Sequence, residues 1–193
     1  AEDGFIAYPT ETVWGLGACA DRPVAVSRLI AWKGRANDAP MSVLISSVDT
    51  ARRLGCKMEG AALRLAEAFW PGPLTLVFRK SEAVPSEVSA GLATVAVRMP
   101  DHELALRLSR ETGRPIAAPS ANRSGRPSPT SADHVLQDLD DRIDAVLLGE
   151  PSEVGMESTI VDVSGDKPCL LRPGGLTLEE VRRIAPEITV AGS

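Results

Sequence analysis

The sequence predicts a mixed-sheet α/β domain, and two patterns indicate this class. Apolar runs of strand length alternate along the chain with segments that have a helical apolar period. Some of the strand-like runs follow one another directly, which a strict βα repeat does not allow. The 193 residues fit one domain, which we expect to span 1–193, and no internal repeat or linker divides them.

The elements expected in the first half begin with a strand that Pro9 stops. Asp21 is a candidate N-cap with Pro23 in the first turn of its helix, and the run 71–73 (Pro-Gly-Pro) stops a later helix. In order, we expect a strand over 4–8, a loop over 9–17, a helix over 21–33, a strand over 41–45, a short helix from 47 or 49 to 55, a helix over 59–69, and strands over 74–78 and 94–98.

The elements expected in the second half are bounded by clear caps. Asp101 opens a helix that Gly113 closes, and Thr177 with Glu180 forms a capping box. In order, we expect a helix over 101–112, a strand over 116–118, a loop over 123–131, a helix from 130 or 131 to 139, strands over 145–148, 159–163 and 169–171, and a helix over 177–184.

Composition and charge exclude several classes of protein. Apolar residues are 44% and charged residues 24% of the chain, which is ordinary for a globular protein and excludes a disordered chain, a coiled coil and a collagen. No apolar run reaches about 18 residues, so we expect no membrane span. The net charge is 21 minus 26, or −5, which argues against a large nucleic-acid footprint but leaves room for a small anionic ligand.

Cysteine and histidine usage favours a reducing cytoplasm and no metal centre. The spacings of Cys19, Cys56 and Cys169 fit neither a metal site nor a disulfide framework. His102 and His134 have no accompanying GxSxG or HExxH motif. The chain begins at Ala1 and not at a methionine, so we expect a few N-terminal residues to be missing from it. The N-terminal segment shows neither a basic region nor a signal-like apolar run.

Two local motifs are discounted. Gly15-x-Gly17-x-x-Ala20 loosely matches a dinucleotide fingerprint, but it stands too far after the strand that ends at Tyr8, and no Walker sequence is present. The run 122–124 (Asn-Arg-Ser) is a formal glycosylation sequon, which we attribute to chance.

Hydroxyls, cations and one amide follow several of the expected strands and one helix. Each has an ordinary explanation by itself, such as a helix C-terminal charge, a turn or a solvated arginine; for Asn122 a left-handed corner is expected. Ligands of open α/β sheets bind at the carboxyl ends of strands, so together these groups predict a cleft for a polyanion. The groups are Thr10 to Thr12, Lys33, Arg35, Arg98, Ser120, Asn122, Ser158 and Arg172.

Seven ordered motifs resemble the Sua5/YrdC/YciO family over about residues 5–181. They are Pro-Thr-Glu-Thr-Val-Trp-Gly-Leu-Gly at 9–17, Lys-Gly-Arg at 33–35, Trp-Pro-Gly-Pro-Leu-Thr at 70–75, Val-Arg-Met-Pro at 97–100, Pro-Ser-Ala-Asn-x-Ser-Gly at 119–125, Ser-Thr-Ile-Val-Asp at 158–162 and Leu-Arg-Pro-Gly at 171–174. The resemblance implies an open twisted sheet flanked by helices, with a large positively charged concave cleft. Its best-known members make threonylcarbamoyl-AMP and pyrophosphate from L-threonine, bicarbonate and ATP, for N6-threonylcarbamoylation of adenosine 37 in tRNA.

The resemblance also implies roles for individual residues. Lys33 and Arg35 would be the catalytic cations on the phosphates, and Mg²⁺ would accompany ATP without a dedicated protein cage. Nucleotide binding is implied for Lys33, Arg35, Thr94, Ser120, Asn122, Ser128 and Arg172. Threonine binding is implied for Thr12, Arg98, Ala118 and Ser158.

The chain departs from the family pattern at a few positions. Ala36 replaces a common proline, Ala39 replaces an asparagine, Leu44 replaces a frequent histidine, and Trp14 replaces the usual tyrosine. The family's frequent second domain is absent from the sequence, so the chain resembles the short, single-domain type.

Two alternative functions stay open at this point. One is a domain that forms carbamoyl-AMP from carbamoyl phosphate and ATP within a carbamoyl transfer system. The other is a non-catalytic module that binds double-stranded RNA. A synthase would pass its product to a separate threonylcarbamoyl transferase complex, so direct contact with tRNA is not required.

Overall fold

A mixed sheet of ten strands forms the framework of the computed structural model, which describes residues 3–34, 40–139 and 142–192. The strand order is β10-β9-β8-β4-β5-β3-β6-β2-β1-β7. Four neighbouring pairs are parallel (β1 with β7, β3 with β5, β4 with β8, and β9 with β10), and the other pairs are antiparallel. The expected mixed sheet is therefore confirmed. The strands are β1 (Ile6–Tyr8), β2 (Gly15–Cys19), β3 (Ser42–Leu44), β4 (Leu74–Arg79), β5 (Thr94–Arg98), β6 (Ile116–Ala117), β7 (Ala145–Val146), β8 (Thr159–Asp162), β9 (Cys169–Arg172) and β10 (Thr189–Val190).

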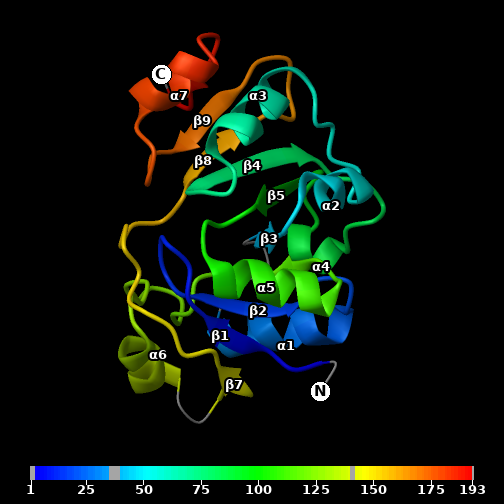
Figure 1. Cartoon of the computed structure of the whole chain (residues 1–193). Coiled ribbons are helices and arrows are strands. Elements are labelled where there is room, and N and C mark those ends of the chain that lie inside the picture. Colours follow the sequence, from blue (N-terminus) through cyan, green and yellow to red (C-terminus); the bar gives the residue numbers. More distant parts are fainter. Residues whose placement is uncertain (1–2, 35–39, 140–141, 193) are drawn as a thin grey trace.

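Helices flank this sheet along its length. They are α1 (Pro23–Lys33), α2 (Val48–Arg53), α3 (Gly60–Phe69), α4 (Ser86–Ser89), α5 (Glu103–Thr112), α6 (Ala132–Leu139) and α7 (Leu178–Ile184). Figure 1 shows α3 and α7 together at the β9–β8–β4 end and α6 with β7 at the opposite end. Within the described ranges, none of the helices has the length and apolar character that crossing a bilayer requires.

The core lies between the sheet and these helices. Trp14, Leu29, Leu65, Leu76 and Phe78 are among its largest fully buried side chains. Apolar and polar residues lie on opposite sides of α5, so the side that faces away from the core is polar.

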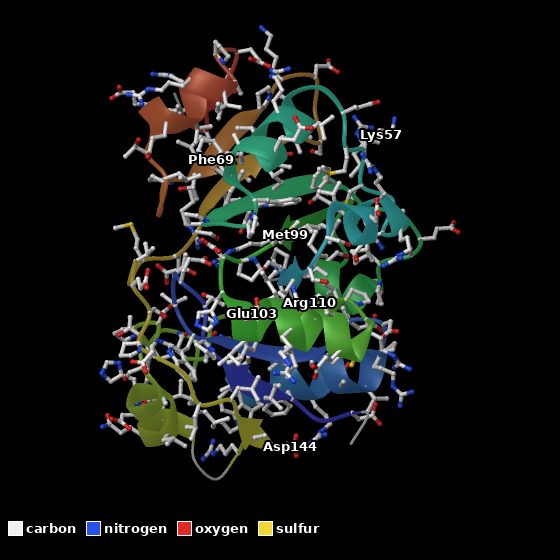
Figure 2. All side chains as sticks on the ribbon, in the orientation of Figure 1. Lys57, Phe69, Met99, Glu103, Arg110 and Asp144 are labelled. Carbon is white, nitrogen blue, oxygen red and sulfur yellow. The ribbon has the colours of Figure 1, made fainter. Side chains whose placement is uncertain are left out.

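Glu103 and Arg110 mark that outward face of α5. Both side chains are labelled on the helix in Figure 2, and Arg110 Nη2 donates to Glu103 Oε1 at 2.7 Å. The pair lies at the protein surface, so its contribution to stability is small.

Several expected helix caps are confirmed. Ser47 accepts from the Thr50 backbone N–H at the start of α2. Gly34 and Gly113 end α1 and α5 with the left-handed backbone that glycine adopts without strain. Two N-caps were wrong: Arg22 rather than Asp21 precedes α1, and His102 rather than Asp101 precedes α5, in both cases without a side-chain cap.

Strand β2 was wrongly expected to be a loop, and α4 and β10 were not expected at all. Glycine is rare inside strands, so Gly15 and Gly17 hide β2 in the sequence. Their lack of a side chain is needed here, because a Cβ on Gly15 would lie 2.7 Å from the Cζ atom of Tyr8 on the neighbouring strand. A close approach between two strands therefore overrides the local propensity.

The contribution of the capping box at the start of α7 to stability can be tested by substitution. Thr177 accepts from the Glu180 backbone N–H, and Glu180 accepts from the Thr177 backbone N–H at 2.7 Å. We expect Thr177→Ala to lower the free energy of unfolding by about 1 kcal/mol, because it removes the cap acceptor. Urea unfolding measures this change. Thr177→Ser keeps the hydroxyl, and equal losses in both variants would contradict the capping argument.

Candidate functional site

The principal candidate site is a cavity of 360 Å³ on one face of the central strands. Thr75 and Val77 of β4 and Thr94, Ala96 and Arg98 of β5 form its floor. These residues alternate along their strands, and alternate side chains of a strand point to the same face. The remaining lining comes from loops and neighbouring strands: Thr12, Val13, Pro40, Met41, Ser42, Leu92, Ala118, Pro119, Ser120, Glu157, Ser158, Ile160, Leu171 and Arg172.

The position of this cavity corrects one expectation. The sequence predicted a cleft at the carboxyl ends of strands. Instead, Thr94 begins β5 and Arg98 ends it, and both line the cavity. The site therefore extends along the sheet face, because small and polar residues on alternate positions of β5 leave that face uncovered.

Arg98 is the central cation of the site. It donates from Nη1 to the Thr12 hydroxyl at 2.7 Å and from Nε to the Gly72 carbonyl at 3.3 Å, and its Nη2 pairs with the Glu11 carboxylate. Burial lowers the pKa of Arg98 to about 10, with a smaller opposing effect from Tyr8, so the guanidinium stays charged at neutral pH. These partners hold one charged fork at the end of β5.

Arg172 supplies the second cation of the lining. Its Nη2 donates to the Ser158 carbonyl at 2.8 Å, and the Ser158 hydroxyl lies 2.7 Å from that of Thr75. A Cβ on Gly174 would lie 2.4 Å from the Glu157 carbonyl oxygen, so only glycine allows this approach. The loop before β8 is thereby packed onto the end of β9.

The loop after β6 forms the opposite wall. The Ala118 backbone N–H donates to the Ser42 carbonyl at 2.8 Å, and the Ser42 hydroxyl donates to the Ala118 carbonyl at 3.1 Å. Lys33 is 2% exposed, and its Nζ donates to the Ser120 carbonyl. Lys33 thus holds the wall that contains Ser120 and is not one of the lining residues.

Asn122 and Arg35 do not belong to the described lining. The Asn122 amide donates to the carbonyls of Arg123 and Arg126, at 2.9 and 2.7 Å, and so fixes the following loop. Its backbone does not have the left-handed conformation that the sequence suggested, since Ala90 is the non-glycine residue with positive φ in the described chain. Arg35, with the departures Ala36 and Ala39, lies outside the described residues.

Ser128 meets the site through a carboxylate that the sequence analysis did not select. Its hydroxyl donates to Glu157 Oε1 at 2.6 Å, and Glu157 lines the cavity. The pKa of Glu157 is held below its usual value, mainly by this hydrogen bond and less by the charge of Arg172. A carboxylate therefore lies beside Arg172 in the lining. The large positively charged cleft that the resemblance implies stays a prediction.

The fold brings together most of the predicted site residues. Seven of them line the one cavity: Thr12, Thr94, Arg98, Ala118, Ser120, Ser158 and Arg172. The sequence analysis named Glu11 only as one of the polar groups of its loop, without a role, and it missed Thr75 and Glu157 as site residues. Thr75 and Val77 alternate along β4 as Thr94, Ala96 and Arg98 alternate along the neighbouring β5, and this pattern could have indicated that Thr75 faces the site. The role of Glu11, in contrast, is visible only in its contact with Arg98.

Comparisons with known proteins show the family to which the chain belongs. A family model for Sua5, YciO and YrdC proteins, described as "Telomere recombination", matches residues 1–174. A protein named threonylcarbamoyl-AMP synthase from Pyrococcus abyssi is 50% identical over 189 residues, and one of the same name from Bacillus subtilis is 48% identical over 190 residues. Both matches cover 98% of this chain.

A solved structure gives the same result at the level of the fold. The structure described as P. abyssi Sua5 complexed with L-threonine superposes with a TM-score of 0.95 and 50% identity over 98% of this chain. The chain spans little more than half the length of these relatives, 56% for the P. abyssi sequence and 55% for the B. subtilis one.

The Ser128 contact leads to a pH-dependent prediction. We expect Ser128→Ala to raise the pKa of Glu157 toward its ordinary value, because the main group that lowers it is removed. In the wild type, the corresponding stabilisation is complete above the unfolded-state pKa and is lost as pH falls through the lower folded-state pKa.

Carboxyl-carbon NMR titration measures the pKa of Glu157 directly. Ser124→Ala is the matched control, since Ser124 is an exposed serine of the same loop. An unchanged Glu157 titration in Ser128→Ala would contradict the assigned cause.

Proposed function

The chain belongs to the Sua5/YciO/YrdC family, and on that premise we propose that it is an L-threonylcarbamoyladenylate synthase. The observation that carries this proposal is the single cavity in which Arg98, Arg172, Thr12, Ser120 and Ser158 meet. The activity named for its relatives needs a site for a triphosphate beside a site for an amino acid.

The proposed reaction has two steps. The amine of L-threonine attacks bicarbonate, water leaves, and N-carboxy-threonine forms. Its new carboxylate attacks the α-phosphorus of ATP, the bond to the β-phosphate oxygen breaks, and pyrophosphate leaves. The product is threonylcarbamoyl-AMP, which makes the enzyme a nucleotidyltransferase.

The proposed residue roles rest on charge and position for the lining residues and on the family resemblance for Lys33, Arg35 and Asn122. We assign threonine to the part of the cavity around Thr12, Arg98, Ala118 and Ser158, where the Arg98 fork suits a carboxylate. Support for this assignment comes from the P. abyssi relative, whose solved complex contains L-threonine. We assign ATP to Thr94, Ser120, Ser128 and Arg172, with Lys33, Arg35 and Asn122 completing the nucleotide site.

Such a site acts mainly by positioning and by stabilising charge. Phosphoryl-type transfer requires little covalent chemistry from the protein, so fixed cations and hydroxyls account for most of its contribution. Arg98 is held by Glu11, Thr12 and Gly72 before any substrate binds, which limits reorganisation during the reaction. Lys33 keeps the Ser120 wall in place.

Magnesium belongs to this proposal as part of the substrate. Within residues 3–34, 40–139 and 142–192, no cluster of three His, Cys, Asp or Glu side chains is arranged to hold a metal ion. Mg²⁺ usually keeps several waters and binds through substrate phosphates, so it would enter with ATP.

The downstream partner in this proposal is a threonylcarbamoyl transferase complex acting on tRNA in the cytoplasm. The adenylate carries the activated group to that complex, so the chain itself need not bind tRNA.

The substrate requirement is the primary test of the function. We expect pyrophosphate release from ATP that requires both L-threonine and bicarbonate, measured in a coupled phosphate assay. Release that continues without L-threonine would contradict the proposal. Carbamoyl phosphate replacing both substrates would indicate a carbamoyl-AMP domain, and a salt-dependent shift of double-stranded RNA without turnover would indicate an RNA-binding module.

Lys33 gives a residue-level test. We expect Lys33→Ala to lower kcat/KM by roughly 10- to 150-fold, because a charge-assisted hydrogen bond contributes about 1.5–3 kcal/mol. Lys57→Ala is the matched control, since Lys57 is an exposed lysine in the loop before α3. Circular dichroism checks that both variants are folded, and a near-normal rate in Lys33→Ala would remove Lys33 from the site.

A further inference from the structure

A polar pocket of 460 Å³ lies between α2 and the C-terminal end of α5. It shares no lining residue with the principal cavity. Figure 1 shows the two helices, and Figure 2 labels Arg110, one of the lining residues, on α5. A volume of this size is typical of sites for small molecules. The pocket is therefore a second candidate site, separate from the first.

The charged groups of this pocket all have the same sign. They are the guanidinium groups of Arg53, Arg110 and Arg114, and the lining that the structure describes contains no carboxylate and no aromatic ring. Four hydroxyl residues complete the polar lining: Ser46, Ser47, Thr50 and Ser109. Guanidinium forks and hydroxyls suit the oxygens of a phosphate group. Without an aromatic surface, the pocket has no stacking platform for a nucleobase.

The α2 side of the pocket shows how its arginines differ from their neighbours. Outside the pocket, Arg52 of α2 and Arg107 of α5 each pair with a carboxylate of their own helix, at 3.2 and 2.6 Å. Within the described ranges, Arg53 makes no ion pair with a carboxylate. Its Nη2 instead donates to the Thr50 hydroxyl at 3.1 Å. The charge of Arg53 is thus left without a counterion from the protein.

The two arginines on the α5 side are only weakly neutralised. Arg110 Nη2 donates to Glu103 Oε1 at 2.7 Å, and Arg114 Nε lies 3.8 Å from Asp21 Oδ2, which is too far for a hydrogen bond. Both pairs are at the surface, where ion pairs contribute little, and neither carboxylate lines the pocket. Each pair engages one nitrogen of a fork that has five N–H donors, so the others can meet an anion.

The end of α5 opposes only part of this positive charge. The aligned peptide dipoles of a helix place about half a negative charge at its C-terminus, against three guanidinium groups here. On the other side, a short chain of hydrogen bonds holds Arg53 in place. The Ser47 and Thr50 hydroxyls lie 3.0 Å apart, and the Thr50 hydroxyl accepts from Arg53. Such preorganisation lowers the entropy cost of binding a ligand.

We propose that this arginine pocket, formed around Arg53, Arg110 and Arg114, binds the phosphate group of a small molecule such as inorganic phosphate or pyrophosphate. A water molecule takes up about 30 Å³, so 460 Å³ holds a diphosphate together with bound water. The proposal does not depend on the synthase function, because none of these residues lines the principal cavity.

Amide NMR of the full ¹⁵N-labelled chain tests this binding directly. We expect pyrophosphate, and more weakly phosphate, to shift the signals of Ser47, Gly113 and Arg114 saturably. Sodium chloride at equal ionic strength is the control for screening. The proposal is overturned if neither anion gives a saturable shift, or if sodium chloride reproduces the shifts. Duplex RNA moving these signals where both small anions fail would also overturn it, in favour of a nucleic-acid surface.

Paired substitutions test whether the pocket, rather than the net charge, binds the anion. We expect Arg53→Ala and Arg110→Ala each to raise the Kd for pyrophosphate, followed on the pocket signals, by about tenfold or more, because a charge-assisted hydrogen bond is lost. The matched controls Arg52→Ala and Arg107→Ala remove the same charge from the same helices outside the pocket.

The controls should leave the Kd nearly unchanged, because exposed charges at a distance are screened at physiological salt. Circular dichroism checks that all four variants are folded. An equal rise of the Kd in all four variants would show a general charge effect and overturn the proposal. An unchanged Kd in both Arg53→Ala and Arg110→Ala would do the same.

Discussion

The buried ion pair between Arg98 and Glu11 is the interaction on which the rest of the site depends. Both side chains are largely removed from solvent, with 13% and 11% of their surfaces exposed. A buried charge without a partner is strongly destabilising, so each group requires the other. The pair joins the end of β5 to the loop between β1 and β2. That loop also contains Thr12, whose hydroxyl accepts a hydrogen bond from the Arg98 guanidinium. Tyr8, at the start of the loop, lines a cavity together with Arg98.

The second constraint is that the central strands pack against the core on one face only. On β5, Val95 and Val97 are buried in the core, while Thr94, Ala96 and Arg98 face the cavity. A sheet normally covers both faces with helices or turns one face to water. Here the open face is enclosed by loops, namely those after β1 and β6 and the one before β8. The cavity is therefore a consequence of the sheet order, which places β5 and β4 between those loops.

The cations of the site have two different tasks. Arg98 and Arg172 line the cavity and can meet an anion directly. Lys33 is more deeply buried than either of them, at 2% exposed, and its ammonium donates to the Ser120 carbonyl and so fixes a wall. Gly34 contributes by ending α1 with a left-handed residue immediately after Lys33. A substitution at Lys33 thus acts through the position of Ser120 as well as through charge.

The sequence by itself determined the α/β class, most strands and helices, the capping box at Thr177 and the family resemblance, because these depend on local periodicity, turn chemistry and short motifs. It did not reveal strand β2, whose glycines contradict strand propensity until Tyr8 packs on them. Nor could it distinguish Lys33 as a wall residue from Arg98 as a lining residue. That distinction was decided by the tertiary structure: Arg98 meets Thr12 across 86 positions of sequence, and such contacts follow from strand order and register, which no local pattern encodes.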